Sequence, residues 1–246
     1  TFKVSTCTAL VTAACGIPVA KHGNRAMSSK SGSADVLTAL GVNIEASLDL
    51  VRESLWSIGI GFFLAPRHHG AMRYVGPTRV ELGTRTIFNL LGPLCNPANV
   101  KSQAMGIFHP DLTDVQANVL KALGSTDIMV FHGRDGLDEI STTATTRISQ
   151  MKNSGDVTTF ELDARELGLD QVSLDDLQGG EPAENADMIR AILNGEKGPK
   201  QDVVLINAAA GIVVGGKAQN LKEGLMKAVE SLESGAALNV FIQLIK

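Results

Sequence analysis

Aromatic residues are scarce in this sequence. They make up 4% of its 246 residues, with one Trp and one Tyr. Proteins that bind single-stranded nucleic acid stack its bases on aromatic side chains, so the composition argues against that class. No apolar run reaches the 18 or more residues that a membrane-spanning helix needs, and we expect no signal peptide. We therefore expect neither a membrane nor a nucleic acid as a partner.

Cysteine and positive charge are also limited. The three cysteines, Cys7, Cys15 and Cys95, are odd in number and lack metal-ligand spacing, which favours a reducing, cytoplasmic compartment over a disulfide framework. The 22 Lys and Arg against 26 Asp and Glu give a net charge of −4. No overall positive field attracts a phosphate backbone, so a polyanion would have to bind locally or through a metal ion.

Glycine is in excess, with 25 residues, which indicates tight turns or loops whose backbone closes on a ligand. Helical and strand patterns alternate along the chain and predict the α/β class, with a mostly parallel central sheet flanked by helices. The expected strands are 17–20, 104–108, 128–131 and 203–206, with a hairpin of 144–151 and 157–162 that turns at 153–156. The expected helices are 5–15, 33–40, 48–58, 77–90, 111–123, 187–193, 207–214 and most of the tail.

The most informative segment follows the expected strand at 17–20. Residues 21–33 read Lys-His-Gly-Asn-Arg-Ala-Met-Ser-Ser-Lys-Ser-Gly-Ser. A turn from strand to helix that is dense in backbone N–H, hydroxyl and cationic groups suits a phosphate ligand. A solvated polar loop is the alternative, and the Walker pattern of phosphate-binding loops is absent.

Two adjacent acidic residues, Asp138 and Glu139, lie in the loop after the expected strand at 128–131. Ligands of open α/β sheets bind beyond the carboxyl ends of the strands, where this loop falls. The side chains of neighbouring residues diverge, so each carboxylate can reach a different hard cation such as Mg²⁺. Alternatively, the pair only favours the start of a following helix through the helix dipole.

Basic side chains also occur at His68, His69 and Arg79. No carboxylate or cysteine nearby completes a zinc site with the histidine pair. Arg79 could hold a carboxylate through two hydrogen bonds, or it could be an ordinary surface arginine of a helix. A further segment, Asn-Ala-Ala-Ala-Gly at 207–211, is explained by close packing of a helix on a sheet without any function.

Together these segments resemble the anthranilate phosphoribosyltransferase family of tryptophan biosynthesis. The resemblance depends on the order and spacing of the blocks at 19–37, 85–97, 136–139 and 207–209, of which the Lys-His-Gly-Asn-Arg motif in the first is highly specific. It implies a fold of the nucleoside phosphorylase and phosphoribosyltransferase kind. The α/β domain would comprise 1–46 and 87–246, and 47–86 would form part of a small helical domain.

The resemblance also implies a reaction, in which the amine of anthranilate displaces pyrophosphate from phosphoribosyl pyrophosphate and gives N-(5-phosphoribosyl)anthranilate. Two Mg²⁺ ions would bind Ser5, Asp138 and Glu139, and anthranilate would contact Asn24, His69 and Arg79. By position, phosphoribosyl pyrophosphate would be held by Thr1, Lys3, Val4, Ser5, Thr6, Lys21, His22, Gly23, Asn24, Arg25, Ala26, Met27, Ser28, Ser29 and Ser33. The full-length protein would be a homodimer.

An anilinic amine is a weak nucleophile, so catalysis would depend on stabilising the charge of the leaving group with Mg²⁺, Lys21 and backbone N–H groups. No residue is expected to act as a covalent nucleophile or as a general acid or base. Phosphorolysis by a pyrimidine nucleoside phosphorylase of similar architecture is one alternative. A non-catalytic, nucleic-acid-binding paralogue is the other, and the negative net charge and the intact acidic pair argue against it.

Two features depart from the family pattern. The family's Gly-Thr-Gly-Gly-Asp pyrophosphate loop, and the helices that precede it, would lie upstream of Thr1. The chain therefore resembles a fragment, which we expect to be inactive alone because part of the pyrophosphate cradle is missing. Lys3 stands where the family pattern has Asn, and it could meet a phosphate or disturb the Mg²⁺ arrangement around Ser5.

Overall fold

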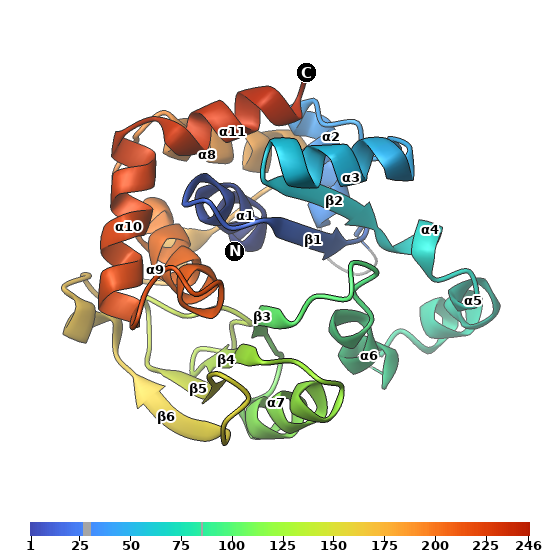
Figure 1. Cartoon of the computed structure of the whole chain (residues 1–246), viewed down its shortest axis with the longest axis horizontal. Coiled ribbons are helices and arrows are strands. Elements are labelled where there is room, and N and C mark those ends of the chain that lie inside the picture. The colour runs from blue at the N-terminus through green and yellow to red at the C-terminus, as the bar shows by residue number, and fades with distance from the viewer. Residues whose placement is uncertain (27–30, 85) are drawn as a thin grey trace.

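Two β-sheets and the helices packed on them form the fold (Figure 1). The structure is a computed structural model that describes residues 1–26, 31–84 and 86–246. The smaller sheet pairs β1 (Val19–Gly23) with β2 (Ile60–Leu64) in parallel. The larger sheet has the order β3 (Ser102–Gly106), β4 (Asp127–Gly133), β5 (Thr146–Met151) and β6 (Thr158–Leu162).

The α/β class is confirmed, but the strands do not form one mostly parallel central sheet. β3 and β4 are parallel, whereas β4 pairs with β5 and β5 with β6 in antiparallel fashion. The predicted hairpin is confirmed and accounts for the antiparallel pairing of β5 with β6. Asn153 and Ser154 have φ of 51° and 58°, the left-handed conformation that tight hairpin turns require.

The helices that the structure describes surround both sheets, and none of these described helices is long and apolar enough to cross a membrane. The predicted helices at 5–15, 33–40, 48–58 and 111–123 are confirmed with small shifts at their ends, and the one at 187–193 is confirmed but begins earlier, at Pro182. The α-helices are α1 (Val4–Ala14), α2 (Ser33–Leu40), α3 (Leu48–Ser57), α4 (Ala65–His68), α5 (Met72–Leu82), α6 (Phe88–Leu94), α7 (Thr113–Ala122), α8 (Pro182–Leu193), α9 (Pro199–Val214), α10 (Leu221–Glu233) and α11 (Ala236–Leu244).

Three expectations about secondary structure were wrong. The expected strand at 203–206 is the middle of α9, because a short apolar run has the same pattern in a buried strand and in a helix buried on all sides. The expected helix at 77–90 is divided between α5 and α6, since Gly83 ends α5 with a φ of 59°. β2 lies in a segment where no strand was expected and is stabilised by its pairing with β1.

The main core is built around α9, which packs against α1 and α10 (Figure 1). Glycines allow the close approach on both sides. A Cβ on Gly211 of α9 would lie 2.8 Å from the Oγ1 of Thr12 in α1, and one on Gly224 of α10 would lie 2.7 Å from the carbonyl oxygen of Ala209. These close contacts fix the positions of α1 and α10 relative to α9.

Candidate functional site

The Lys-His-Gly segment expected to bind phosphate forms the C-terminal end of β1. Its last residue, Gly23, approaches the start of α2 so closely that a Cβ would lie 2.2 Å from the Oγ of Ser33. Ser33 Oγ and the N–H of Ala34 both donate to the carbonyl of Asn24, at 3.3 and 3.1 Å. The strand end and the helix N-terminus thus lie directly against each other, an arrangement suited to an anion.

A carboxylate that the sequence analysis did not single out holds two points of the loop between β1 and α2. Asp35 accepts hydrogen bonds from the N–H groups of Ala26 and Gly32, at 2.8 and 2.9 Å, and pairs with Arg25 at 3.5 Å. Burial raises the pKa of Asp35, but these N–H groups and Arg25 outweigh it and leave the pKa below its usual value. Three expected contacts lie outside the described residues: Met27, Ser28 and Ser29.

Side chains from three separate parts of the chain lie near the end of β1: Ser5 contacts Lys21, and Glu139 is near enough for the two charges to act on each other. Lys21 Nζ donates to the Oγ of Ser5, in the first turn of α1, at 3.4 Å. Burial raises the pKa of Glu139 to about 8, and the charge of Asp138 acts in the same direction, against the opposing charges of Lys21 and Lys3. The two segments expected to bind Mg²⁺, at Ser5 and at Asp138–Glu139, therefore both lie close to Lys21.

The pKa of Lys21 depends on the same neighbouring charges. Burial lowers this pKa, the charge of Lys3 lowers it further, and the charge of Glu139 raises it. Lys3, which stands in place of the family's Asn, is thus near the acidic pair. Its positive charge acts on both of the groups that are expected to handle pyrophosphate and metal.

The loop after β4 presents the acidic pair by contacts within the loop and with β3. The carboxylate of Asp135 accepts hydrogen bonds from the hydroxyls of Ser141 and Thr143 and so closes the loop on itself. On the other side, a Cβ on Gly106 of β3 would lie only 1.6 Å from the carbonyl oxygen of Asp138. Glycine is required there because the backbone of Asp138 lies directly against the strand.

The donor chemistry of Ser5, Asp138 and Glu139 fits Mg²⁺. Within the described part of the chain, no group of three or more His, Cys, Asp and Glu residues could hold a metal by itself. Mg²⁺ keeps several waters and is usually bound by one or two carboxylates together with substrate phosphates. A hydroxyl and two carboxylates provide such an incomplete set. A divalent cation would also relieve the repulsion by Asp138 that helps raise the pKa of Glu139.

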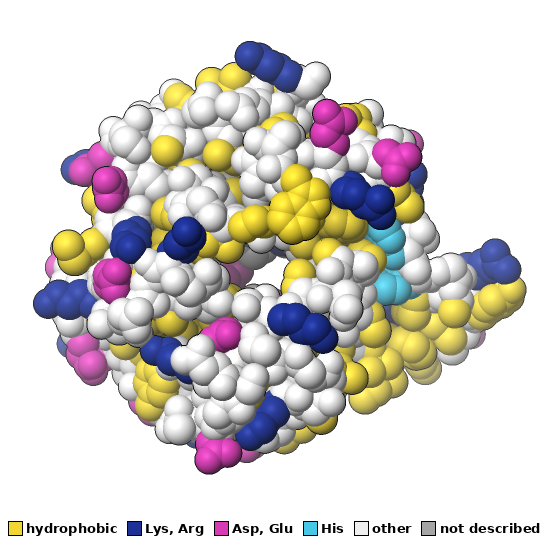
Figure 2. Space-filling model, viewed as in Figure 1, with side chains coloured by type: hydrophobic (Ala, Val, Ile, Leu, Met, Phe, Trp, Pro, Cys, Tyr) yellow, Lys and Arg dark blue, Asp and Glu magenta, His cyan; other side chains and the backbone are white. Residues whose placement is uncertain are grey.

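A pair of histidines lies beside the end of β1. The Nε2 atoms of His22 and His69 are 3.1 Å apart, with the ring centroids at 5.0 Å and the planes at 71°. Burial lowers the pKa of His22 to about 4, and the charges of His69, His68 and Lys21 act in the same direction. Figure 2 shows histidine side chains grouped on this face, next to the hydrophobic side chains over α5 and α6.

Arg79 belongs to α5, where its guanidinium carbon lies 5.6 Å from the centroid of the Phe88 ring. Among the described contacts, none joins Arg79 directly to Asn24 or His69, so the structure does not bring the three expected anthranilate contacts into one bonded cluster. The joint role of these three residues stays a prediction.

A contact that the sequence analysis missed joins the Asn-Ala-Ala segment to the acidic loop. Asn207 of α9 is 2% exposed, and its side-chain amide bonds both the N–H and the carbonyl of Ile140, each at 2.9 Å. Ile140 directly follows Glu139 in the chain. Packing of a helix on a sheet, which the sequence analysis took as sufficient for this segment, does not account for these bonds.

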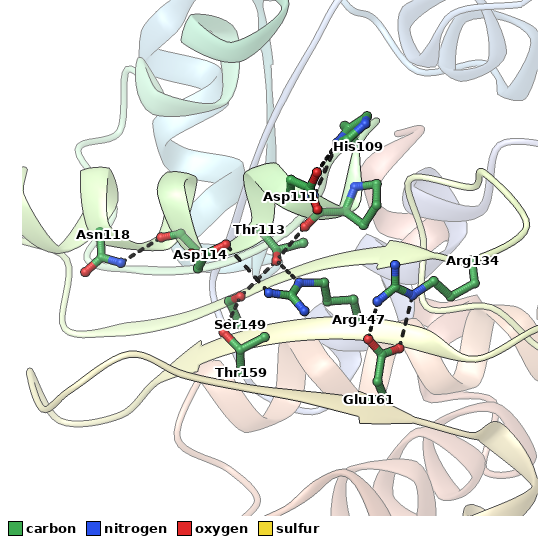
Figure 3. Close-up of polar contacts among 11 residues, drawn as sticks. His109, Asp111, Thr113, Asp114, Asn118, Arg134, Arg147, Ser149, Thr159 and Glu161 are labelled. Carbon is green, nitrogen blue, oxygen red and sulfur yellow. Dashed lines mark hydrogen bonds and ion pairs between the residues drawn. The ribbon is translucent and has the colours of Figure 1, made fainter.

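A separate group of polar side chains lies on the four-stranded sheet (Figure 3). Arg134, directly after β4, pairs with Glu161 of β6, while the Oγ of Ser149 and the Nε of Arg147 donate to the Oγ1 of Thr113 at 2.9 and 3.2 Å. These groups satisfy one another's hydrogen bonds and join α7 to the sheet. Their role is structural.

Comparison with known proteins gives one consistent result. Residues 1–238 match the model of the family described as "Glycosyl transferase family, a/b domain". A protein from Brucella ovis named anthranilate phosphoribosyltransferase is 54% identical over 244 residues, which cover 99% of this chain and 71% of the relative.

Solved structures agree with the sequence comparison. The anthranilate phosphoribosyltransferase of Thermus thermophilus aligns with a TM-score of 0.93 and 44% identity, over 99% of this chain and 72% of that one. The enzyme of Saccharomyces cerevisiae in complex with PRPP and Mg gives 0.88 and 32%, over 100% and 69%. Its complex with 4-fluoroanthranilate gives 0.87 and 29%, over 100% and 68%.

Proposed function

We propose a function from one premise: the chain belongs to the anthranilate phosphoribosyltransferase family. It is a glycosyl-transferring enzyme, of the pentosyltransferase kind. In the proposed reaction, the amine nitrogen of anthranilate forms a bond to C1 of phosphoribosyl pyrophosphate. The bond from C1 to the pyrophosphate oxygen breaks, the amine loses a proton, and N-(5-phosphoribosyl)anthranilate and pyrophosphate are released.

The observation that carries the proposal is the hydrogen bond from Lys21 to Ser5 at the end of β1, with Glu139 near enough for its charge to act on Lys21. Pyrophosphate is a strongly anionic leaving group, and its departure is favoured by cations placed where its charge develops. Lys21 supplies one such charge from β1. Ser5, Asp138 and Glu139 would supply oxygen atoms to Mg²⁺, which we propose binds as two ions. When bound, Mg²⁺ neutralises charge on the pyrophosphate.

The segment from Thr1 to Thr6 contributes the N-terminus of α1 to the same site. The positive end of a helix dipole and the free N–H groups of a first turn favour phosphate. Val4 and Thr6 are each 1% exposed, so in this proposal their backbone and not their side chains meets the substrate. Lys3 adds a charge that Asn would not.

The turn from β1 to α2 holds the phosphoribosyl part of the substrate. Its proposed contacts are His22, Gly23, Asn24, Arg25, Ala26 and Ser33, with the expected contacts at 27–29. The tight approach of Gly23 to Ser33 fixes the two ends of this segment relative to each other before substrate binds. Such preorganisation lowers the entropic cost of binding.

In this proposal, anthranilate contacts Asn24, His69 and Arg79. Arg79 pairs with its carboxylate through a planar guanidinium, which suits two parallel hydrogen bonds. A pKa of about 4 makes His22 a weak proton acceptor at neutral pH, which supports leaving it without an acid–base role. No side chain of the described residues is proposed as a covalent nucleophile.

We further propose that the full-length protein is a cytoplasmic homodimer. The exposed aromatic side chains of Trp56 on α3 and Tyr74 on α5 support a contact surface on these helices. The cysteine content supports a reducing compartment. Gel filtration with light scattering tests the oligomeric state, and a monomer at micromolar concentration would reject the dimer.

Anthranilate fluorescence, followed with the full-length protein, tests the proposed reaction. The signal should fall when phosphoribosyl pyrophosphate and Mg²⁺ are both present, and it should stay constant when either is omitted. Thymidine and uridine with phosphate serve as the comparison, because a nucleoside phosphorylase would cleave them. Phosphorolysis without any loss of anthranilate would replace the proposed function with the phosphorylase alternative.

A further inference from the structure

The side chain of Asn207 makes three hydrogen bonds to the backbone. Its Oδ1 accepts from the N–H of Ile140 at 2.9 Å, and its Nδ2 donates to the carbonyl of the same residue at 2.9 Å. Nδ2 also donates to the carbonyl of Val203, one turn earlier in α9, at 2.8 Å. The bond to Val203 fixes the orientation of the side-chain amide, and the amide in turn fixes the backbone of Ile140.

Holding Ile140 restricts the acidic pair that precedes it. Two bonds to one residue define both its position and the orientation of its peptide groups, so the chain at Glu139 cannot rotate freely. At the other end of the pair, Gly106 of β3 touches the carbonyl of Asp138. The backbone of the two carboxylates is thus fixed between α9 and β3.

The same helix also fixes the position of α1. Gly211 lies one turn after Asn207, and a Cβ there would be 2.8 Å from the Oγ1 of Thr12 and 3.0 Å from its Cγ2. Thr12 belongs to α1, whose first turn carries Ser5. One face of α9 therefore contacts both elements that supply oxygen atoms to the candidate metal site.

We propose that Asn207 is a positioning residue, which fixes the position of the Asp138–Glu139 pair relative to Ser5. The inference rests on the proposed function. An asparagine amide suits this place because it offers an acceptor and two donors to a backbone N–H and two carbonyls. Alanine would leave buried backbone groups unpaired and free the loop to move. Groups that orient metal ligands without touching the metal typically change metal affinity or activity by about 10–100-fold.

Asn185 provides a matched control. It is a buried asparagine of α8, 1% exposed, whose Oδ1 accepts from the N–H of Gly180 at 3.3 Å and whose Nδ2 donates to the carbonyl of Gly180 at 2.7 Å. The bonding is of the same kind as that of Asn207, but it is made to a different loop. Asn185→Ala measures what the loss of a buried amide does when its partner is not the acidic loop.

The test compares Asn207→Ala with Asn185→Ala. Mn²⁺ binding in the presence of inorganic pyrophosphate is measured by calorimetry, and thermal unfolding is measured for both variants. We expect both to lose stability, but only Asn207→Ala to weaken Mn²⁺ binding, by about tenfold or more. The Mg²⁺ concentration for half-maximal activity should rise by the same factor, with the anthranilate KM within twofold of the wild type. Unchanged Mn²⁺ affinity, or an equal loss in Asn185→Ala, would overturn the inference.

Two further measurements cover a variant that does not fold. Asn207→Ser keeps a polar group and leaves space for water, so its Mn²⁺ affinity should fall between those of the wild type and Asn207→Ala. In the wild type, Mn²⁺ with pyrophosphate should slow hydrogen exchange of the Ile140 amide more than that of Gly180, and equal slowing would contradict the inference. A wild type without Mg²⁺-dependent transfer rejects the proposed function itself, whereas normal transfer with unaltered Asn207 variants rejects only the role of Asn207.

Discussion

Lys21 Nζ donates a hydrogen bond to the Oγ of Ser5 at 3.4 Å, and this contact joins the end of β1 to the first turn of α1. The bond is long, so its own energy is small. Its significance is geometric: it places a cation beside a hydroxyl at the positive end of a helix. With Glu139 acting on the same lysine, three distant segments form one candidate pyrophosphate site.

Removing the charge of Lys21 should reduce catalysis more than stability. In Lys21→Met, kcat/KM for phosphoribosyl pyrophosphate should fall by about 100-fold or more, since one charge that stabilises the leaving group is lost. Stability should be little changed. Burial lowers the pKa of Lys21, so the charged ammonium group is already disfavoured in the folded protein and its loss removes little stabilisation. Steady-state kinetics and thermal unfolding measure the two effects. Lys222→Met, on the exposed start of α10, is the control; equal kinetics in both variants would contradict the role of Lys21.

Replacing Arg79 should affect anthranilate selectively. Loss of a charge-assisted pair of about 1.5–3 kcal/mol predicts that Arg79→Ala raises the anthranilate KM by roughly 10–100-fold, with a small effect on the phosphoribosyl pyrophosphate KM. Arg73→Ala is the matched control, because Arg73 lies on the same helix with its guanidinium carbon 4.7 Å from the centroid of the Tyr74 ring. A loss confined to phosphoribosyl pyrophosphate affinity would reject the assignment of Arg79.

His22 should make the stability of the protein depend on pH. Its pKa is about 4 in the folded protein against 6.5 for an ordinary histidine, so between these values the unfolded chain binds the extra proton. Stability from this group is therefore complete above about pH 6.5 and falls as the pH drops towards 4. Urea unfolding at pH 7.5 and pH 5 should show a smaller loss for His22→Gln than for the wild type. Parallel losses would show that His22 titrates normally.

A methyl group on Gly106 should displace the acidic loop. Gly106→Ala places a Cβ 1.6 Å from the carbonyl oxygen of Asp138, so backbone must move, at a cost of about 1–3 kcal/mol. The Mg²⁺ requirement for activity should rise with it. Gly76→Ala, on α5 with no atom within 4 Å of the added Cβ, should leave both properties near the wild type. Wild-type stability and Mg²⁺ response in Gly106→Ala would contradict the contact.

Local patterns predicted most of the secondary structure. Helix α2 lies between Gly32 and Gly41, and the latter has a φ of 96°, so its bounds follow from glycine punctuation. β2 was missed because its stability comes from pairing with β1, across about forty residues. The segment 203–206 was assigned to a strand because the burial of its helix among α1, α10 and the four-stranded sheet is a tertiary property that the run of four apolar residues does not encode.

For the candidate site, the sequence indicated residue types better than partners. Lys21 and Glu139 were identified because charged groups in glycine-rich loops after strands are typical of ligand sites. Asn207 was not, since its partner Ile140 lies 67 residues away and a buried amide has no sequence signal of its own. Asp35 could have been found: an acidic residue in the first turn of a helix often bonds the N–H groups before it.

Pyrophosphate release from phosphoribosyl pyrophosphate and anthranilate, measured as Mg²⁺ is titrated, tests the central claim most directly. The comparison is between the wild type and the double variant Asp138→Ala, Glu139→Ala. The account predicts that release by the wild type rises with Mg²⁺ and saturates, whereas the double variant stays folded and loses at least about 99% of the rate. A folded double variant that releases pyrophosphate at the wild-type rate, with the same Mg²⁺ dependence, would contradict the account.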